Sequence, residues 1–318
     1  MPFYGLNAKV IRESYLSLEE LIMNKQTKVW LVLSLVLSLL AVASSCGGSK
    51  GPETNQPGTD ATAAGPYTGP TGTISGVISY NGTPPAPKKI DTAADPVCGQ
   101  ANPNLTTDDT IVKDGKLANV FVYVKDGTVD GGGKKIGDYT WPTPTTAVTL
   151  DQNGCHYKPH VLGLQVNQKL SVTNSDKTTH NIHPTPTLNK EWNKTQSVGA
   201  GPIEESFARA ETLIPVKCNQ HPWMKAYIGV TKHPLFAVSS DTGAFEIKNV
   251  PAGTYTVVAW REGGAKGTEK TMQVTVPANG SAKADFAFGE GAGPATSSVQ
   301  PSLQVMPAIE FPMLSKKN

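Results

Sequence analysis

The chain has 318 residues, room for one or two domains with tails, and a formal net charge of only +2 at pH 7. Because the charges are nearly balanced and form no clustered basic stretch, the composition gives no reason to expect a nucleic-acid partner. The 31 glycines and 25 prolines, with aliphatic residues in short bursts, favour short strands joined by turns. The composition therefore predicts an all-β protein.

The N-terminal 45 residues have the pattern of a secretory signal. A positive segment that starts at Met23 precedes an uncharged apolar run over 29–43 and small residues before Cys46. This arrangement resembles a bacterial lipoprotein box, although Ala43 stands where Leu is commonest, and it implies lipid on Cys46. The alternative is an uncleaved membrane helix, but the run of about 15 residues is shorter than the roughly 20 that span a bilayer. We expect a signal peptide over 1–45, beginning at Met1 or at Met23, and export to the periplasmic or outer-surface face of a bacterial membrane.

The next segments alternate between irregular chain and strand. Residues 46–71 are Gly, Pro, Thr and Ala with few large apolar side chains, so we expect a flexible tether. A strand is predicted over 73–80, and 84–110 is expected to be irregular. The run 117–124 is apolar on both faces, which predicts a central strand of a sandwich.

A soft set of possible metal ligands follows further along. Cys218, His221 and Met224 are spaced by three residues in a loop between two predicted strands, so all three side chains can turn toward one point. Thiolate and thioether suit copper, whereas imidazole suits copper, zinc or iron. A trigonal copper site needs a second imidazole, and His180 supplies it from the loop after the predicted strands of 162–173. The amide of Asn181 is placed to tie the two ligand loops together.

Two of these stretches resemble a known family. The loop Cys218-Asn-Gln-His221-Pro-Trp-Met224 is similar to the copper loop of the cupredoxins, on their short-loop amicyanin and pseudoazurin side, and the segment 174–181 is similar to the family's first-histidine loop. The resemblance implies a Greek-key sandwich of eight strands with one type 1 copper held by His180, Cys218, His221 and Met224. The chain departs from the family in His183, an extra imidazole, and in the long insertion before residue 111. His183 is a surface residue, a competing ligand or a landing point for incoming metal.

Two further cysteines then lack a role. With Cys46 assigned to lipid and Cys218 to metal, Cys98 and Cys155 remain, and outside the cytoplasm such a pair favours a disulfide. A second metal site formed by both cysteines with His156 and His160 is the alternative, although its spacings match no zinc pattern.

The C-terminal part predicts a second small sandwich. Five strand-like runs between 235 and 288 are separated by turn signals at regular intervals. Residues 243–261 resemble the carboxypeptidase regulatory-like module, which is of the prealbumin type, and 74–85 resembles its usual opening. We therefore expect a cupredoxin-like domain over 72–232, with the strand 73–80 belonging to either module, a carboxypeptidase regulatory-like domain over 233–288, and a disordered tail over 289–318.

These predictions together indicate an exported, lipid-anchored blue copper protein that transfers single electrons with an unidentified redox partner protein. No nucleophile motif supports an enzyme, and six histidines hardly supply a second copper centre. Two alternatives stay open: a non-redox surface module for protein interaction or carbohydrate binding, and copper storage or delivery.

Overall fold

A computed structural model describes residues 64–263, 267–292 and 295–300. The expected signal peptide, the lipidation residue Cys46, most of the tether and residues 301–318 lie outside the described part. Among the described residues, no helix is long and apolar enough to cross a membrane.

Strands account for nearly all of the regular structure, as the sequence predicts, and the all-β class is confirmed. The elements in chain order are β1 (Ala64–Pro66), β2 (Thr71–Asn81), α2 (Pro96–Ala101), β3 (Val112–Lys113), β4 (Lys116–Leu117), β5 (Phe121–Val129), the 3-10 helix η1 (Ile136–Asp138), β6 (Tyr139–Thr140), β7 (Val148–Gln152), β8 (Tyr157–Lys158), β9 (Val161–Gln165), β10 (Leu170–Asn174), β11 (His180–Pro184), β12 (Lys194–Gln196), β13 (Ile203–Glu205), β14 (Glu211–Lys217), β15 (Lys225–Thr231), β16 (Phe236–Val238), β17 (Ala244–Pro251), β18 (Gly253–Arg261), β19 (Thr268–Val276), β20 (Ser281–Gly289) and β21 (Thr296–Gln300).

One sandwich, which we call the inserted sandwich, is built from the strands between residues 148 and 231. Its two sheets have the orders β13-β10-β7-β8 and β12-β11-β14-β15-β9, and each contains one parallel pair, β10 with β7 and β15 with β9. Alternate residues such as Leu170 and Val172 on β10 are fully buried, while those between them are half-buried. The apolar faces of the two sheets therefore pack against each other as one core.

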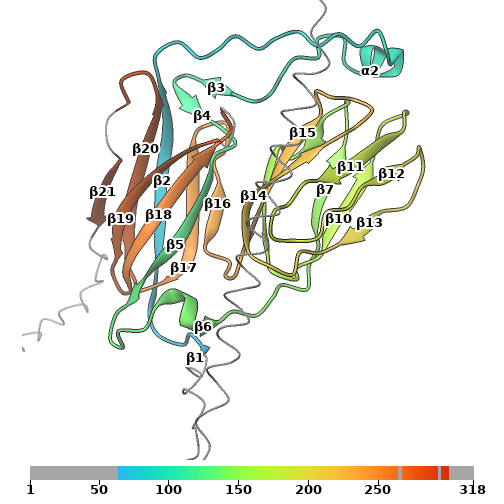
Figure 1. Ribbon diagram of the computed structural model, residues 1–318. Helices are drawn as coiled ribbons and strands as arrows, with labels where there is room; N and C mark the ends of the chain where they lie inside the picture. The colour runs from blue at the N-terminus through green and yellow to red at the C-terminus, as the bar shows by residue number, and fades with distance from the viewer. Residues whose placement is uncertain (1–63, 264–266, 293–294, 301–318) are drawn as a thin grey trace, which may run out of the picture. The chain divides into compact units, whose positions relative to one another are not determined.

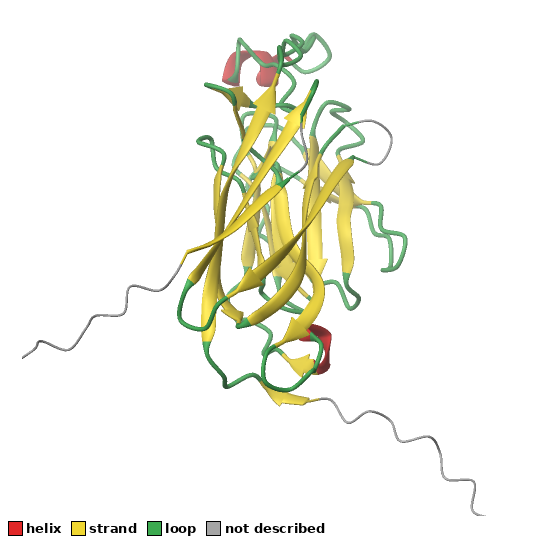
Figure 2. Cartoon of the chain, turned by 90° about the vertical axis from the view of Figure 1, so that its left-hand side faces the viewer, coloured by secondary structure: helices red, strands yellow, loops and turns green. Residues whose placement is uncertain are grey.

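The other sandwich, which we call the flanking sandwich, uses strands from both sides of this insertion. Its sheets have the orders β16-β5-β18-β19 and β21-β20-β2-β4-β3, with β17 also paired to β2. In Figure 1 the blue strand β2 lies beside the red-brown β20, with which it pairs in parallel. Ile74 and Ile78 of β2 are fully buried in this core. Figure 2 shows the two short helices at opposite ends of the strands.

Several segments differ from their expected places. The strand 117–124 was expected in the cupredoxin-like domain, but β5 pairs with β16 and β18 of the flanking sandwich. An apolar pattern shows that a strand is buried without showing which strand lies beside it. Within the expected tether, β1 pairs with β6, and within the expected tail, β21 pairs with β20, so both of those predictions were wrong for these residues.

Two glycines let the sandwiches approach closely. Gly163 of β9 and Gly229 of β15 face each other in register, and a Cβ atom on either would lie 2.4 Å or less from a ring atom of Phe236 or Phe121. The two phenyl rings stack with centroids 5.5 Å apart. Phe121 also belongs to a buried cluster of residues from both sandwiches, in which each such side chain contributes about 1.5–3 kcal/mol.

Candidate metal centre

The loop between β14 and β15 carries three of the four predicted ligands. The backbone N–H of Cys218 donates to the carbonyl of Met224 at 3.2 Å, and the N–H of Met224 donates to the carbonyl of His221 at 2.9 Å. Between them Pro222 fixes one φ angle and offers no donor. The loop is thus closed by its own backbone, and the side chains of Cys218, His221 and Met224 are all buried.

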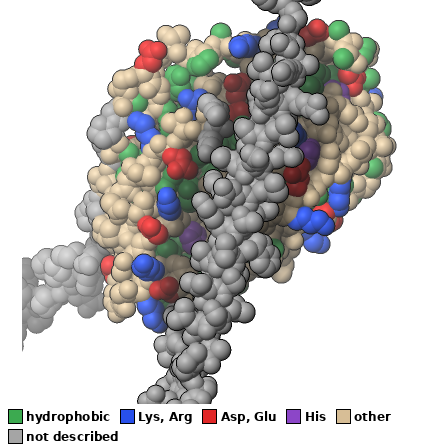
Figure 3. All heavy atoms as spheres, in the orientation of Figure 1, with side chains coloured by type: hydrophobic (Ala, Val, Ile, Leu, Met, Phe, Trp, Pro, Cys, Tyr) green, Lys and Arg blue, Asp and Glu red, His purple; other side chains and the backbone are tan. Residues whose placement is uncertain are grey.

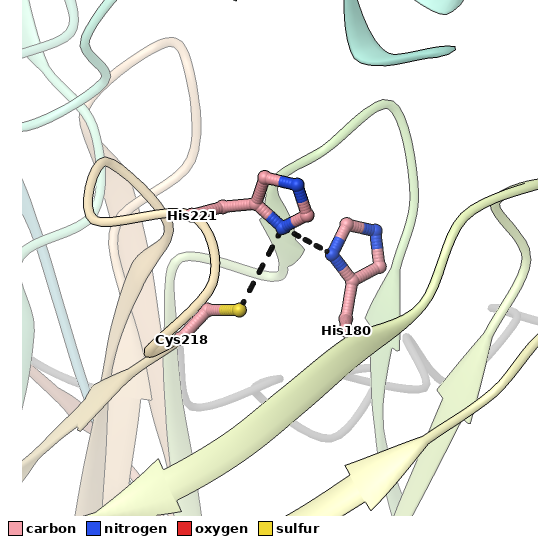
Figure 4. Close-up of side chains that lie close together, drawn as sticks. All are labelled: His180, Cys218 and His221. Carbon is pink, nitrogen blue, oxygen red and sulfur yellow. Dashed lines mark hydrogen bonds between the residues drawn. The ribbon is translucent and has the colours of Figure 1, made fainter. Parts of the chain in front are cut away.

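The fourth predicted ligand, His180, comes from the first position of β11. Its Nδ1 lies 2.9 Å from Nδ1 of His221, which in turn lies 3.7 Å from Sγ of Cys218 (Figure 4). One ring nitrogen of each histidine and Sγ of Cys218 all lie within 4.8 Å of one another. The start of β11 and the loop after β14, about 40 residues apart in sequence, therefore bring their side chains to one buried point.

Each imidazole is held from its far side by a carboxylate. Nε2 of His180 lies 2.9 Å from Oδ2 of Asp176, and Nε2 of His221 lies 2.9 Å from Oδ2 of Asp95. A carboxylate only accepts, so both Nε2 atoms carry hydrogen, and Nδ1 is the nitrogen of each ring that faces the ligand group. Two Nδ1 lone pairs 2.9 Å apart repel each other unless a cation or proton lies between them.

Asn181 joins the two ligand segments. Its Oδ1 accepts the backbone N–H of Asn219 at 2.7 Å and lies 3.3 Å from Sγ of Cys218, while its Nδ2 donates to Oδ1 of Asn193 at 2.8 Å. The hydroxyl of Tyr157 donates to its carbonyl at 2.5 Å. The side chain therefore fixes the Cys218 end of the loop against β11.

The surroundings favour the thiolate form of Cys218. Burial alone raises the pKa of a thiol, but the imidazoles of His180 and His221 outweigh it and lower the pKa to about 5. Conversely, burial lowers the pKa of His180, while Asp176 and Cys218 raise it to about 9. These shifts describe a thiolate–imidazolium pair at neutral pH, in which Cys218 already has the form that binds metal.

The remaining predicted residues have definite places. Met224 is fully buried at the base of the loop, bound through its backbone to both Cys218 and His221. The ring of His183 is held outside the ligand group by Asn219 at 3.1 Å and by Glu191 at 2.6 Å. The ring of Trp223 lies 5.1 Å from that of His221.

The predicted disulfide between Cys98 and Cys155 is confirmed, and it leaves neither sulfur for the alternative metal site. Both cysteines are fully buried and they fasten helix α2, from the long insertion, to the inserted sandwich. Asp95 is the N-cap of α2 and accepts a hydrogen bond from Thr178 at 2.7 Å. On the Cys155 side of the disulfide, the carboxylate of Asp176 accepts hydrogen bonds from the backbone N–H groups of Gly154 and Cys155.

The sequence analysis missed both carboxylates. Asp95 stands directly before Pro96, a spacing typical of a helix start, so a capping role could have been read from it. Its contact with His221 could not, because the two residues are 126 positions apart. Asp176 lies four residues before His180, within the segment that resembles the family's first-histidine loop. Its short distance in sequence is a signal from which a contact with His180 could have been predicted.

The donor set fits copper. Two imidazoles and a thiolate converge, a thioether residue is buried in the same loop, and a carboxylate orients each ring. His180, Cys218 and His221 could hold the ion, and the predicted fourth ligand, Met224, is buried in the same loop.

Comparisons with known proteins give partial matches. The family model described as "Polysaccharide lyase family 4, domain II" matches residues 223–284, which run from the end of the loop between β14 and β15 into β20. This family is not the carboxypeptidase regulatory-like family that the sequence analysis named for the C-terminal module. No curated protein matches the chain.

Among solved structures, the chain is similar to the copper-containing nitrite reductase of Thermus scotoductus SA-01, with 21% identity over 27% of this chain and 22% of that one, at a TM-score of 0.25. A reduced amicyanin mutant matches with 19% identity over 27% and 82%, at 0.25. A purple cupredoxin of Nitrosopumilus maritimus matches with 25% identity over 24% and 82%, at 0.21. The chain thus spans about a fifth of the nitrite reductase. TM-scores this low do not establish a shared fold. The description of two β-sandwiches therefore depends on the observed strand pairing.

Proposed function

We propose that this protein is an exported, lipid-anchored copper protein that carries single electrons. The observation that supports it best is the convergence of two Nδ1 atoms and one thiol sulfur, with each ring held by a carboxylate. Bound copper would supply a one-electron redox couple. The protein's part is to keep the ligands in one arrangement for both oxidation states, which lowers the cost of reorganisation.

The chain's own residues are arranged for that rigidity. The loop is closed by backbone hydrogen bonds, Asn181 ties it to β11, and the disulfide with Asp95 fixes the outer side of His221. Burial of all four proposed ligands excludes bulk water from the centre. A site held in this way is suited to electron transfer rather than to substrate turnover.

The disulfide also supports the proposed location. Structural disulfides persist in oxidising compartments, so Cys98–Cys155 favours export. Lipid on Cys46 would hold the protein at the periplasmic or outer-surface face of a bacterial membrane, within reach of a redox partner protein. In Figure 3 acidic and basic side chains are interspersed on the face drawn, which suits a protein partner better than nucleic acid.

The test is the addition of Cu(II) to the purified protein. We expect an intense visible thiolate band that disappears in Cys218→Ser and persists in His183→Ala, because His183 lies outside the ligand group. Reversible one-electron reduction of the coloured protein is the second expected result. A colourless protein would overturn electron transfer and leave the interaction or carbohydrate-binding module, whereas a coloured protein without reversible reduction would favour storage or delivery.

A further inference from the structure

A cavity lined by apolar and basic side chains lies away from the metal centre. It has a volume of about 520 Å³, and its lining includes the apolar side chains of Trp141, Val166 and Leu188 and the cations of Arg209 and Lys232. None of the described residues that line it is acidic. The cavity therefore offers an apolar wall and two positive charges in one place.

This cavity is at the end of the inserted sandwich opposite to the metal centre. β14 begins at Glu211, close to Arg209 in sequence, and leads into the loop that carries Cys218. β15 begins at the other end of that loop and ends directly before Lys232. The two strands that carry the ligand loop at one end therefore lead to the cavity at their other end.

The two cations have no partner in the described part of the chain. No ion pair or side-chain hydrogen bond there involves the guanidinium of Arg209 or the ammonium of Lys232. Both residues are exposed. Two like charges that line one cavity without a counter-charge favour an anionic partner.

Leu188 is held on the surface by the backbone around it. Its side chain is 56% exposed, the highest value among the large apolar side chains described. The carboxylate of Glu211 accepts the backbone N–H of Leu188 at 3.0 Å and that of Asn189 at 3.1 Å. The side-chain amide of Asn189 also bonds to the backbone N–H and carbonyl of Arg209, both at 2.9 Å. Because this turn is already ordered, contact of Leu188 with an apolar phase costs little further ordering.

The described chain begins beside the same end of the molecule. β1, which starts at Ala64, pairs with β6, and β6 directly precedes Trp141. Cys46, the proposed lipidation residue, is 18 residues before Ala64, and a chain of that length spans at most about 60 Å. Lipid on Cys46 would therefore keep this end of the protein near the bilayer without deciding which face meets it.

We propose that this cavity and its rim dock on the surface of an anionic phospholipid membrane, which turns the metal centre away from the bilayer toward a soluble redox partner. The inference rests on the proposed lipid anchor. Arg209 and Lys232 meet the lipid phosphates, and Leu188 and the half-exposed ring of Trp141 reach the boundary of the acyl chains, where such side chains are typical anchors. The N–H of Trp141 already donates to the carbonyl of Ile136 at 3.3 Å, so its ring can enter this boundary without losing a hydrogen bond to water.

The experiment measures which end of the full chain meets the bilayer. Ala208→Cys, at the cavity, and Lys177→Cys, exposed in the loop before His180, each carry a fluorophore, and quenching by brominated acyl chains reports contact with the hydrocarbon region. Vesicles of phosphatidylcholine are compared with vesicles that also contain anionic phosphatidylglycerol. The wild type treated with the same reagent gives the background. We expect the label at 208 to be quenched in the anionic vesicles and the label at 177 to be quenched in neither.

Charge variants test the two cations. Arg209→Gln and Lys232→Gln should each lower the ratio of docked to undocked label at 208 about fivefold, and together about 30-fold. Lys113→Gln is the matched control, because it removes an exposed lysine of β3 that is not part of the cavity. Circular dichroism verifies that each variant is folded.

Three results would overturn the proposal: quenching at 208 that is equal in the two kinds of vesicle, quenching that Arg209→Gln/Lys232→Gln leaves unchanged, and equal quenching of the label at 177. Flotation with neutral vesicles tests the anchor separately. A chain that does not float counts against lipid on Cys46, while quenching at 208 by anionic vesicles still supports the docking surface. The copper band is measured without vesicles, so its absence counts against electron transfer alone.

Discussion

Carboxylates behind imidazoles recur in this protein, and they decide which nitrogen of each ring is available. His180, His221 and His160 each place Nε2 within 2.9 Å of a carboxylate oxygen. Each ring is thereby held in one orientation. For His180 and His221, the imidazoles of the proposed copper site, the cost of ordering the ligands is met during folding.

Asn181 gives the first prediction at this scale. In Asn181→Ala the half-buried N–H of Asn219 loses its acceptor and the loop loses its tie to β11. We expect the free energy of unfolding to fall by about 1–3 kcal/mol, measured by urea denaturation. Asn193→Ala is the control, since Asn193 is exposed and accepts a hydrogen bond from the other end of the same amide. Equal losses in the two variants would contradict the role of the Asn219 bond.

At the scale of elements, the segment between β2 and β3, which carries helix α2, completes the candidate metal centre. Helix α2 has only six residues, too few to be stable by itself, and the disulfide holds it in place. Asp95 at its N-cap then reaches both Thr178 and His221. A segment with little regular structure thus supplies one of the two carboxylates behind the ligand rings.

The double substitution Cys98→Ser/Cys155→Ser tests this arrangement. The bond closes a loop of 57 residues, so its loss should reduce the free energy of unfolding by about 2–5 kcal/mol, measured by urea denaturation. Because Asp95 is then less firmly held, we also expect weaker copper binding, in the same direction as in Asp95→Asn. A double variant with wild-type copper affinity and lower stability would show that the helix keeps its place without the disulfide.

At the scale of the whole molecule, the part of the site that could be predicted is the part that is local in sequence. Cys218, His221 and Met224 lie within seven residues, so their spacing alone indicates a common target. His180 and Asn181 were found through a second local pattern. The contact of Asp95 with His221 was not predicted, because nothing in the sequence connects two residues 126 positions apart.

The fold shows the same limit. The regular turn signals after 235 predicted the strands of the flanking sandwich, and the resemblance of 74–85 left open that the strand 73–80 belongs to the same module. The pairing of β5 with β18 could not be read, since both faces of β5 are apolar and several partners would satisfy it. The sequence also gives no sign that Gly163 and Gly229 differ from other strand glycines, because their need for a missing side chain comes from the ring of Phe121, which packs against both.

The pH dependence of stability tests the connection between the sandwiches. His160 precedes β9 of the inserted sandwich, and Glu262 follows β18 of the flanking sandwich. Burial opposes protonation of His160, but Asp108 and Glu262 raise its pKa to about 9 in the folded protein, against about 6.5 in the unfolded chain. The raised pKa means that this stabilisation is complete below about pH 6.5 and is lost as the pH rises to about 9.

We therefore expect urea denaturation, with a chelator present, to show a difference in the free energy of unfolding between the wild type and His160→Gln. This difference should shrink by on the order of 3 kcal/mol from pH 6 to pH 9.5. His183→Gln is the matched control, because it removes an imidazole whose carboxylate partner, Glu191, is exposed. If the difference in the free energy of unfolding stays constant over this range, His160 is neutral between its two carboxylates. The sandwiches are then joined at this point by the packing of Tyr227 against Trp260 rather than by charge.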